Sequence, residues 1–84
     1  MIYSLTIVTS ARKELLALPN EIIKRIDTII NRLAYAPRPY GCVKLKGVNA
    51  YRLRMGNYRI IYNIDDKQHQ IIILAIGHRR EIYR

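Results

Sequence analysis

The fold of this chain is decided by residues 50–64, AYRLRMGNYRIIYNI. Gly56-Asn57 is a dipeptide typical of a two-residue turn, and the residues on either side alternate between apolar and basic or polar side chains. We therefore predict a β-hairpin in which Met55 faces Tyr58 and Arg54 faces Arg59. Alternation assigns two faces: Tyr51, Leu53, Met55, Tyr58, Ile60, Tyr62 and Ile64 on the apolar one, and Arg52, Arg54 and Arg59 on the other.

Two further strands are expected, one earlier and one later in the sequence than this hairpin. Residues 70–76 are rich in isoleucine and should form a third antiparallel strand after the polar turn 65–69. Residues 2–8 contain β-branched and aromatic side chains and predict a strand at the start of the chain. Pro37 and Pro39 favour a loop through Val43.

Two helices are predicted between residues 9 and 36. Thr9 or Ser10 can cap a short first helix, which Pro19 interrupts. From Glu21 onward, isoleucines and a leucine recur at helical spacing and form one apolar stripe up to Leu33. The expected fold class is α+β: a small antiparallel sheet in the order β-α-α-β-β-β with two N-terminal helices packed on one face, as a single domain over residues 1–84.

The charge of the chain predicts a polyanionic partner. Lys and Arg number 15 against 6 Asp and Glu, a formal charge of +9. Residues 38–84 carry most of the excess, which points to this half as the binding surface. Cys42 is the only cysteine, so an intramolecular disulfide is excluded and a reducing, cytoplasmic location is expected. No stretch approaches the ~20 apolar residues of a membrane span, so no membrane association is expected.

The arginine face is the first candidate for chemistry. Like charges directly across a strand pair are destabilising by up to about 1 kcal/mol, so the pairing of Arg54 with Arg59 suggests a phosphate ligand. The alternative is that Arg52, Arg54 and Arg59 spread into solvent on an ordinary wet sheet face.

The segment from Gly77 to Arg84 is the second candidate, because it combines an imidazole, a phenol and arginines. His78 could move protons near neutral pH, and Tyr83 could stack on a base or bind a phosphate. Both could equally be surface residues. The six carboxylates are dispersed and no glycine-rich phosphate loop is present, so neither a metal nor another cofactor is expected.

These segments together resemble the RelE/ParE superfamily of bacterial toxins. The resemblance rests on the Leu18-Pro19 junction and on the ordered runs 44–47, 51–54, 56–62 and 77–83. It implies a compact sheet with two N-terminal helices and an acidic, RelB-like antitoxin as partner. Its RelE branch implies an endoribonuclease that enters the ribosomal A site and cuts mRNA, leaving a 2′,3′-cyclic phosphate.

The resemblance also implies roles for single residues. The basic pair of the second strand corresponds to Arg52 and Arg54, the transition-state arginine to Arg59, the general-acid arginine to Arg79 and the terminal tyrosine to Tyr83. Relatives often carry lysines at the first two positions. Because arginine stays protonated, His78 would have to act as the base, or catalysis would depend on electrostatics alone. Lys44, Lys46, Arg80 and Arg84 are the expected RNA-binding residues.

Two other functions fit the sequence. A ParE-like inhibitor of DNA gyrase would share the fold and act by binding a protein. A non-catalytic RNA-binding domain would use the same basic surface. The joint presence of Arg52, Arg54, Arg59, Arg79 and Tyr83 favours the nuclease, because a gyrase inhibitor has no evident need for them.

Overall fold

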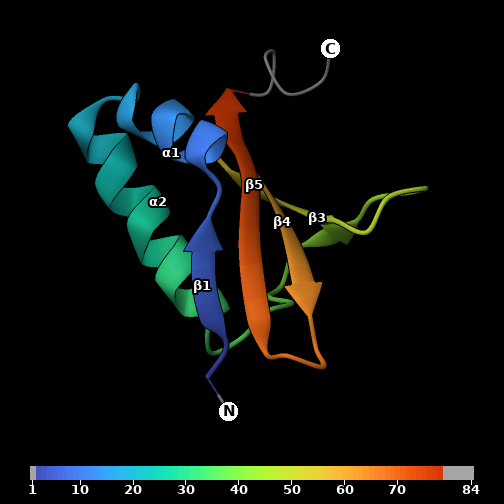
Figure 1. The fold of residues 1–84 in the computed structure, drawn as a ribbon. Helices are drawn as coiled ribbons and strands as arrows, with labels where there is room; N and C mark the ends of the chain where they lie inside the picture. Colours follow the sequence, from blue (N-terminus) through green and yellow to red (C-terminus); the bar gives the residue numbers. More distant parts are fainter. Residues whose placement is uncertain (1, 79–84) are drawn as a thin grey trace.

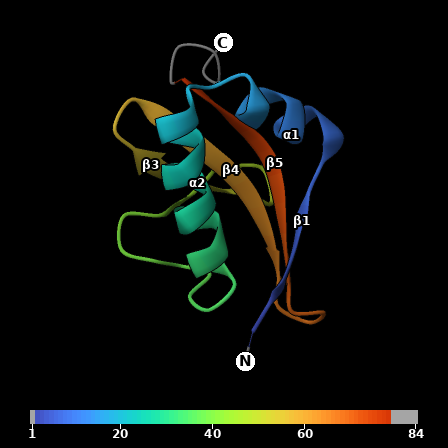
Figure 2. The ribbon, with the colours of Figure 1, turned by 90° about the vertical axis from the view of Figure 1, so that its left-hand side faces the viewer.

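The structure is a computed structural model, and it describes residues 2–78 of the chain (Figure 1). Within this range two helices and five strands follow one another along the chain: β1 (Ser4–Ile7), α1 (Thr9–Leu16), α2 (Asn20–Leu33), β2 (Val43–Lys44), β3 (Tyr51–Met55), β4 (Tyr58–Asp65) and β5 (Gln70–His78). Both helices cover the same face of the sheet, and no helix within residues 2–78 covers the opposite face, which we call the open face (Figure 2). The α+β class is confirmed.

The strands form one sheet in the order β1-β5-β4-β3-β2. β2, β3, β4 and β5 pair antiparallel, whereas β1 lies parallel to β5, so the sheet is mixed and not wholly antiparallel as expected. The physical reason is the path of the chain. The helices carry it from β1 across one face to the other edge of the sheet, so the neighbour of β1 is the last strand and no tight turn dictates its direction.

The central hairpin has the predicted register. Met55 pairs with Tyr58, Arg54 with Arg59 and Leu53 with Ile60 across the turn at Gly56. Gly56 has φ +58°, a left-handed conformation that glycine adopts without a steric penalty. The two predicted faces are therefore correct.

The predicted loop through Val43 ends one residue earlier in the structure, because Val43 begins a strand. Val43 and Lys44 form the short strand β2, which pairs with Arg52 and Tyr51 of β3. Helix α2 already ends at Leu33, before the two prolines. The effect of Pro37 and Pro39 on the backbone is local, and the chain regains extended geometry soon enough to pair with the edge of β3.

The first helix begins differently from the prediction. Neither Thr9 nor Ser10 is the cap. Val8 occupies that position, in extended geometry and without a side-chain cap hydrogen bond. Val8 continues the ladder of β1, because its N–H donates to the carbonyl of Ile73 (3.1 Å), so the helix can start only at the next residue. The second helix begins at Asn20, one residue before the predicted start.

The core lies between the helices and the sheet. Ala11 and Leu15 of α1 and Ile26 of α2 are buried together with apolar residues of the three long strands, among them Ile60, Tyr62, Ile71, Ile73 and Ile76. The Tyr62 hydroxyl donates to the carbonyl of Pro37 (2.8 Å), and burial, the largest cause, together with the nearby Cys42 thiol raises its pKa above the usual range. The core therefore lies on the face of the sheet that the helices cover.

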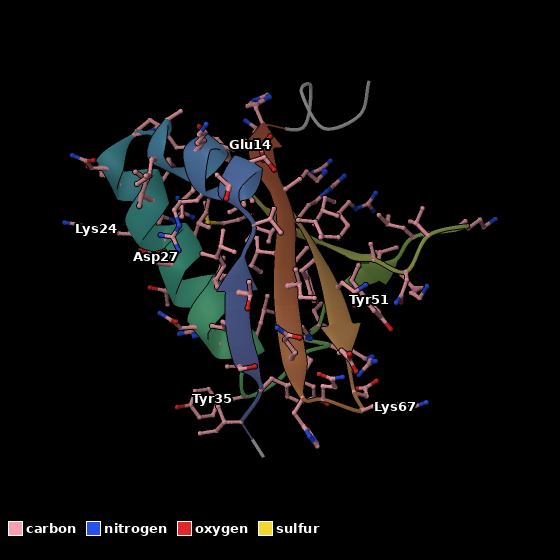
Figure 3. The ribbon with its side chains drawn as sticks, viewed as in Figure 1. Glu14, Lys24, Asp27, Tyr35, Tyr51 and Lys67 are labelled. Atoms are coloured by element: carbon pink, nitrogen blue, oxygen red, sulfur yellow. The ribbon has the colours of Figure 1, made fainter. Side chains whose placement is uncertain are left out.

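Helix α1 also covers part of the edge of β5. Strand β1 ends at Ile7, which pairs with Ile73, and β5 continues to His78. The N–H of Ile76 donates to Oε1 of Glu14 (3.1 Å), a residue of α1 that lies next to the end of β5 (Figure 3). The carboxylate of Glu14 therefore accepts a hydrogen bond from a backbone N–H of β5 that has no acceptor on any of the described strands.

Candidate functional site

Three arginines lie on the open face of the β3–β4 hairpin. Arg54 and Arg59 are directly opposite each other, and Arg52 is the next same-face residue on β3. Arg54 is exposed, Arg52 is half-buried and Arg59 is only 3% exposed. On its other side Arg59 pairs with Gly77 of β5, which has no side chain to occupy the position beside the guanidinium.

The burial of Arg59 is a feature that sequence reasoning missed. Alternation predicts the face of a strand residue but not how deeply it is covered. A guanidinium keeps its charge when it is buried, so folding stabilises it only where other groups compensate. Arg52 and Arg59 both interact with other groups of the protein. The site therefore holds a fixed, desolvated cation beside an exposed one, Arg54, which suits recognition of a phosphate.

His78 lies elsewhere. The sequence predicts it beyond the last strand, but β5 continues through His78 because Gly77 and His78 extend the ladder opposite Arg59 and Tyr58. The rings of His78 and Tyr58 meet edge to face, with centroids 5.7 Å apart. As cross-strand neighbours they share the apolar face of the hairpin, opposite the arginines. The other predicted site residues of this segment, Arg79, Arg80, Tyr83 and Arg84, lie outside the described residues.

The two lysines predicted to bind RNA lie at the far edge of the sheet. Lys44 pairs with Tyr51, donates through Nζ to the carbonyl of Val48 (3.0 Å), and lies 5.7 Å from the centre of the Tyr51 ring. Lys46 is exposed in the loop between β2 and β3. The register separates Lys44 from the three arginines, because its partner Tyr51 belongs to the opposite face.

A polar cluster near the β4–β5 turn, at the end of β4 remote from Gly56, was not predicted. Arg38 forms an ion pair with Asp66 through both terminal nitrogens (2.8 and 3.3 Å), and its Nε donates to the hydroxyl of Tyr51 (3.2 Å). The hydroxyl of Tyr3 donates to the same carboxylate (2.7 Å). The pKa of Asp66 is lowered chiefly by the hydrogen bond from Arg38 and next by that from Tyr3. No sequence signal points to this cluster, because its members are far apart in the chain.

This cluster predicts an acid-dependent loss of stability. Because the folded pKa of Asp66 lies below its ordinary value of 3.8, its contribution is fully present above that value and is lost as pH falls through the folded pKa. We expect Asp66→Asn to lower the Tm slightly at pH 7 and to have no effect at strongly acidic pH. Asp27→Asn, an exposed change on α2, is the control. An equal Tm difference at both pH values would contradict the prediction.

An apolar groove lies between α2 and β3. It has a volume of about 560 Å³ and is lined by apolar side chains together with two arginines: Ile29, Arg32, Leu33, Tyr35, Ala36, Pro39, Tyr40, Leu53 and Arg54. Tyr40 is fully exposed and Tyr35 is 70% exposed. Strand β2 pairs only with Tyr51 and Arg52, so none of the described strands covers the outer edge of β3 beside this groove.

Two further observations concern the described part of the chain, residues 2–78. No group of three or more histidine, cysteine, aspartate or glutamate side chains is placed to hold a metal ion there. Neither of the two helices is long and apolar enough to cross a membrane.

Comparison with known proteins identifies the family. Residues 5–83 match the family model described as the ParE toxin of the type II toxin-antitoxin system parDE. The chain belongs to this toxin family. Toxin RelG of Mycobacterium tuberculosis is 31% identical over 86 residues, which cover 100% of this chain and 99% of RelG. Toxin RelE of the same organism is 30% identical, over 98% of this chain and 87% of RelE.

Solved structures of this toxin family share the fold. The toxin-antitoxin complex RelBE2 of M. tuberculosis matches with a TM-score of 0.84 at 28% identity, over 94% of this chain and 100% of that one. The archaeal RelE-RelB complex of Pyrococcus horikoshii matches with a TM-score of 0.83 at 33% identity, over 94% and 97%. This chain is therefore a toxin of the RelE/ParE superfamily, as the sequence resemblance indicated.

Proposed function

We propose that this toxin is a ribosome-dependent endoribonuclease that cleaves mRNA in the ribosomal A site. The observation that carries the proposal is the cross-strand pair of Arg54 and Arg59, with Arg52 beside it, on the open face of the sheet. Side chains directly opposite each other on a strand pair lie about 5 Å apart at Cβ, so a phosphate that approaches this pair would accept charge-assisted hydrogen bonds from both guanidinium groups. The cytoplasm is the compartment in which such a toxin would meet ribosomes.

The proposed reaction needs no redox step and no covalent enzyme intermediate. The ribose 2′-oxygen attacks the adjacent phosphorus, a 2′-O–P bond forms, and the P–O5′ bond breaks. The products are a 2′,3′-cyclic phosphate and a 5′-hydroxyl, so one proton leaves the 2′-oxygen and one reaches the 5′-oxygen. Arg54 and Arg59 would stabilise the extra negative charge of the pentacoordinate phosphate, and Arg52 would help to hold the RNA. Arg79 and Tyr83 stay in the proposal as general acid and stacking residue.

The register does not bring the predicted base to the arginine face. His78 was the sequence-based candidate, and it lies beside Tyr58 on the opposite face from Arg59. We therefore expect His78→Ala to retain the pH profile of single-turnover cleavage on programmed ribosomes. Tyr83→Phe, measured in parallel, tests the other titratable side chain of this segment. If the rise of the cleavage rate near neutral pH were lost in His78→Ala and kept in Tyr83→Phe, the base would be His78.

A decisive test separates this function from gyrase inhibition, which the name of the matching family keeps open. Purified toxin is added either to programmed ribosomes, followed by primer extension on the message, or to gyrase in a supercoiling reaction. We expect cuts inside the reading frame that require ribosomes, and undisturbed supercoiling. An intact message together with blocked gyrase would overturn the nuclease proposal.

The proposed partner is an acidic antitoxin encoded with the toxin. Structures of relatives were determined as complexes with RelB, and this chain carries a charge of +9. The antitoxin could cover the arginine face, as the charge predicts. The groove between α2 and β3 offers apolar surface, and its two arginines complement an acidic chain.

We predict that electrostatic steering sets the speed of this association. Raising the salt from low to high ionic strength should slow association by about tenfold or more and change dissociation much less, because counterions screen the long-range attraction. Tyr40→Ala should speed dissociation, whereas Leu16→Ala, an exposed apolar change on α1, should not. Stopped-flow mixing at several salt concentrations measures both rates. An association rate that ignores salt would refute the steering.

A further inference from the structure

A second pocket lies at the end of β4 that is remote from the hairpin turn. Its lining residues come from the β2–β3 loop, β4, the β4–β5 turn and β5: Asn49, Asn63, Ile64, Asp65, Asp66, Lys67 and Ile72. The pocket is an open depression with a volume of about 480 Å³. Lys67 marks its position at the turn between β4 and β5 (Figure 3). We call it the Asn63 pocket.

The Asn63 pocket shares a face with the arginines. Arg59, Ile61, Asn63 and Asp65 are alternate residues of β4, so all four belong to the open face. At about 3.3 Å per residue, Asn63 is about 13 Å and Asp65 about 20 Å along the strand from Arg59. Half-buried Ile61 lies between the two polar regions. One strand thus presents a phosphate-binding end, an apolar middle and an amide and carboxylate end.

The polar groups of the pocket are held in place by the protein. Nδ2 of Asn63, a half-buried residue that lines the pocket, donates to the carbonyl of Asn49 (2.8 Å), which uses one of the two N–H groups of this amide. Oδ1 of Asp65 accepts the backbone N–H of Gln68 (3.0 Å), which fixes the carboxylate at the turn. Binding a ligand would therefore cost little side-chain entropy.

The charge balance of the pocket favours a neutral ligand with N–H donors. Asp66 forms an ion pair with Arg38, and the two other charged residues that line the pocket, Asp65 and Lys67, carry opposite formal charges. A phosphate would meet the two carboxylates with Lys67 as the single cation among the lining residues, whereas the amino group of a base would meet acceptor oxygens. Asparagine and aspartate are side chains that read base edges, the first on adenine and the second on the amino group of cytosine.

We propose that the Asn63 pocket binds one unpaired RNA base that carries an exocyclic amino group, at a fixed offset from the phosphate held by Arg54 and Arg59. Single-stranded RNA is recognised in this way, through bases splayed from the chain and hydrogen-bonded on their edges. The pocket would give the toxin its own sequence preference, additional to any that the ribosome imposes. This proposal rests on the nuclease function proposed above.

The test maps cut sites along several messages with wild-type toxin, Asp65→Asn and Asn63→Ala on programmed ribosomes. Wild type should favour adenine, cytosine or guanine over uracil at one offset position. Each variant should reduce that preference at least fivefold, because an acceptor for the amino group is altered or lost. Asp27→Asn makes the same chemical change on α2 and should keep the wild-type distribution (Figure 3). Variants that cut with the wild-type distribution would overturn the proposal.

A second measurement separates this proposal from the nuclease function. The side-chain amide signal of Asn63 is followed by NMR while cytidine, uridine or ribose 5-phosphate is added to the toxin. Cytidine should shift this signal, and ribose 5-phosphate should not. If wild type cuts no message, the nuclease proposal fails and the titration alone decides the pocket. If cytidine and ribose 5-phosphate then act alike, the pocket does not read bases.

Discussion

Replacing Arg59 by alanine is expected to slow single-turnover cleavage about 10²–10³-fold, the loss typical of removing one preorganised donor to a transition-state anion. The guanidinium is fixed and largely desolvated, so its attraction to a developing charge is little screened by water. Arg59→Lys retains the charge but not the planar pair of donors, and it should recover only part of the rate. Rapid-quench cleavage on programmed ribosomes measures all three proteins.

Burial adds a stability cost to this variant. Charge alone suggests that Arg59→Ala should be harmless to the fold, since it relieves repulsion with Arg54. However, Arg59 is buried and interacts with other groups, so we expect a lower Tm. Arg54→Ala is the matched control: Arg54 is exposed, so this variant should melt like wild type and still cut more slowly. Normal cutting by a folded Arg59→Ala protein would show that Arg59 is structural only.

Ile26→Ala is expected to destabilise the protein by about 2–5 kcal/mol. Ile26 is fully buried, in the same cluster as Ile60 and Ile73 of the sheet, and truncation leaves a cavity where α2 packs. A domain of 84 residues typically has a free energy of unfolding of about 4–13 kcal/mol, so this loss is a large fraction of the total. Urea denaturation followed by circular dichroism gives the difference in the free energy of unfolding.

Leu16→Ala is the control for this measurement, because Leu16 is 64% exposed on α1 and truncating it creates no cavity. It should change the free energy of unfolding by about 0.5 kcal/mol or less. If Ile26→Ala behaved like Leu16→Ala, the helix α2 would not be anchored through this side chain.

The hairpin and its faces were predictable because they depend on local rules. Gly56-Asn57 fixes the turn, the turn fixes the register, and the register assigns Arg54 and Arg59 to one face. The apolar stripe of α2 is likewise local, and its buried members Ile26 and Ile30 are among the residues that define it. The family followed from the order of such local motifs along the chain.

Features that depend on remote pairing were not predictable from these rules. The parallel direction of β1 is set by the route of the helices over the sheet, and the ion pair of Arg38 with Asp66 joins two loops that only the finished fold brings together. The place of His78 beside Tyr58 follows from how far β5 extends, and the burial of Arg59 is a tertiary feature that alternation does not specify. Alternation and spacing carry no information about the length of a distant partner strand.

The pairing of the first strand with the last makes folding of this toxin a late event in its synthesis. Ile7 finds its partner Ile73 only after the whole segment between them has been translated, about 3–13 s later at about 5–20 residues per second. Until then β1 has no neighbour, and α1 lacks β5, the strand against which it packs. A nascent chain in this state has no completed sheet on which the arginines could be arranged. The order of the strands therefore delays the appearance of a working toxin, an interval in which an antitoxin already present can meet it as it folds.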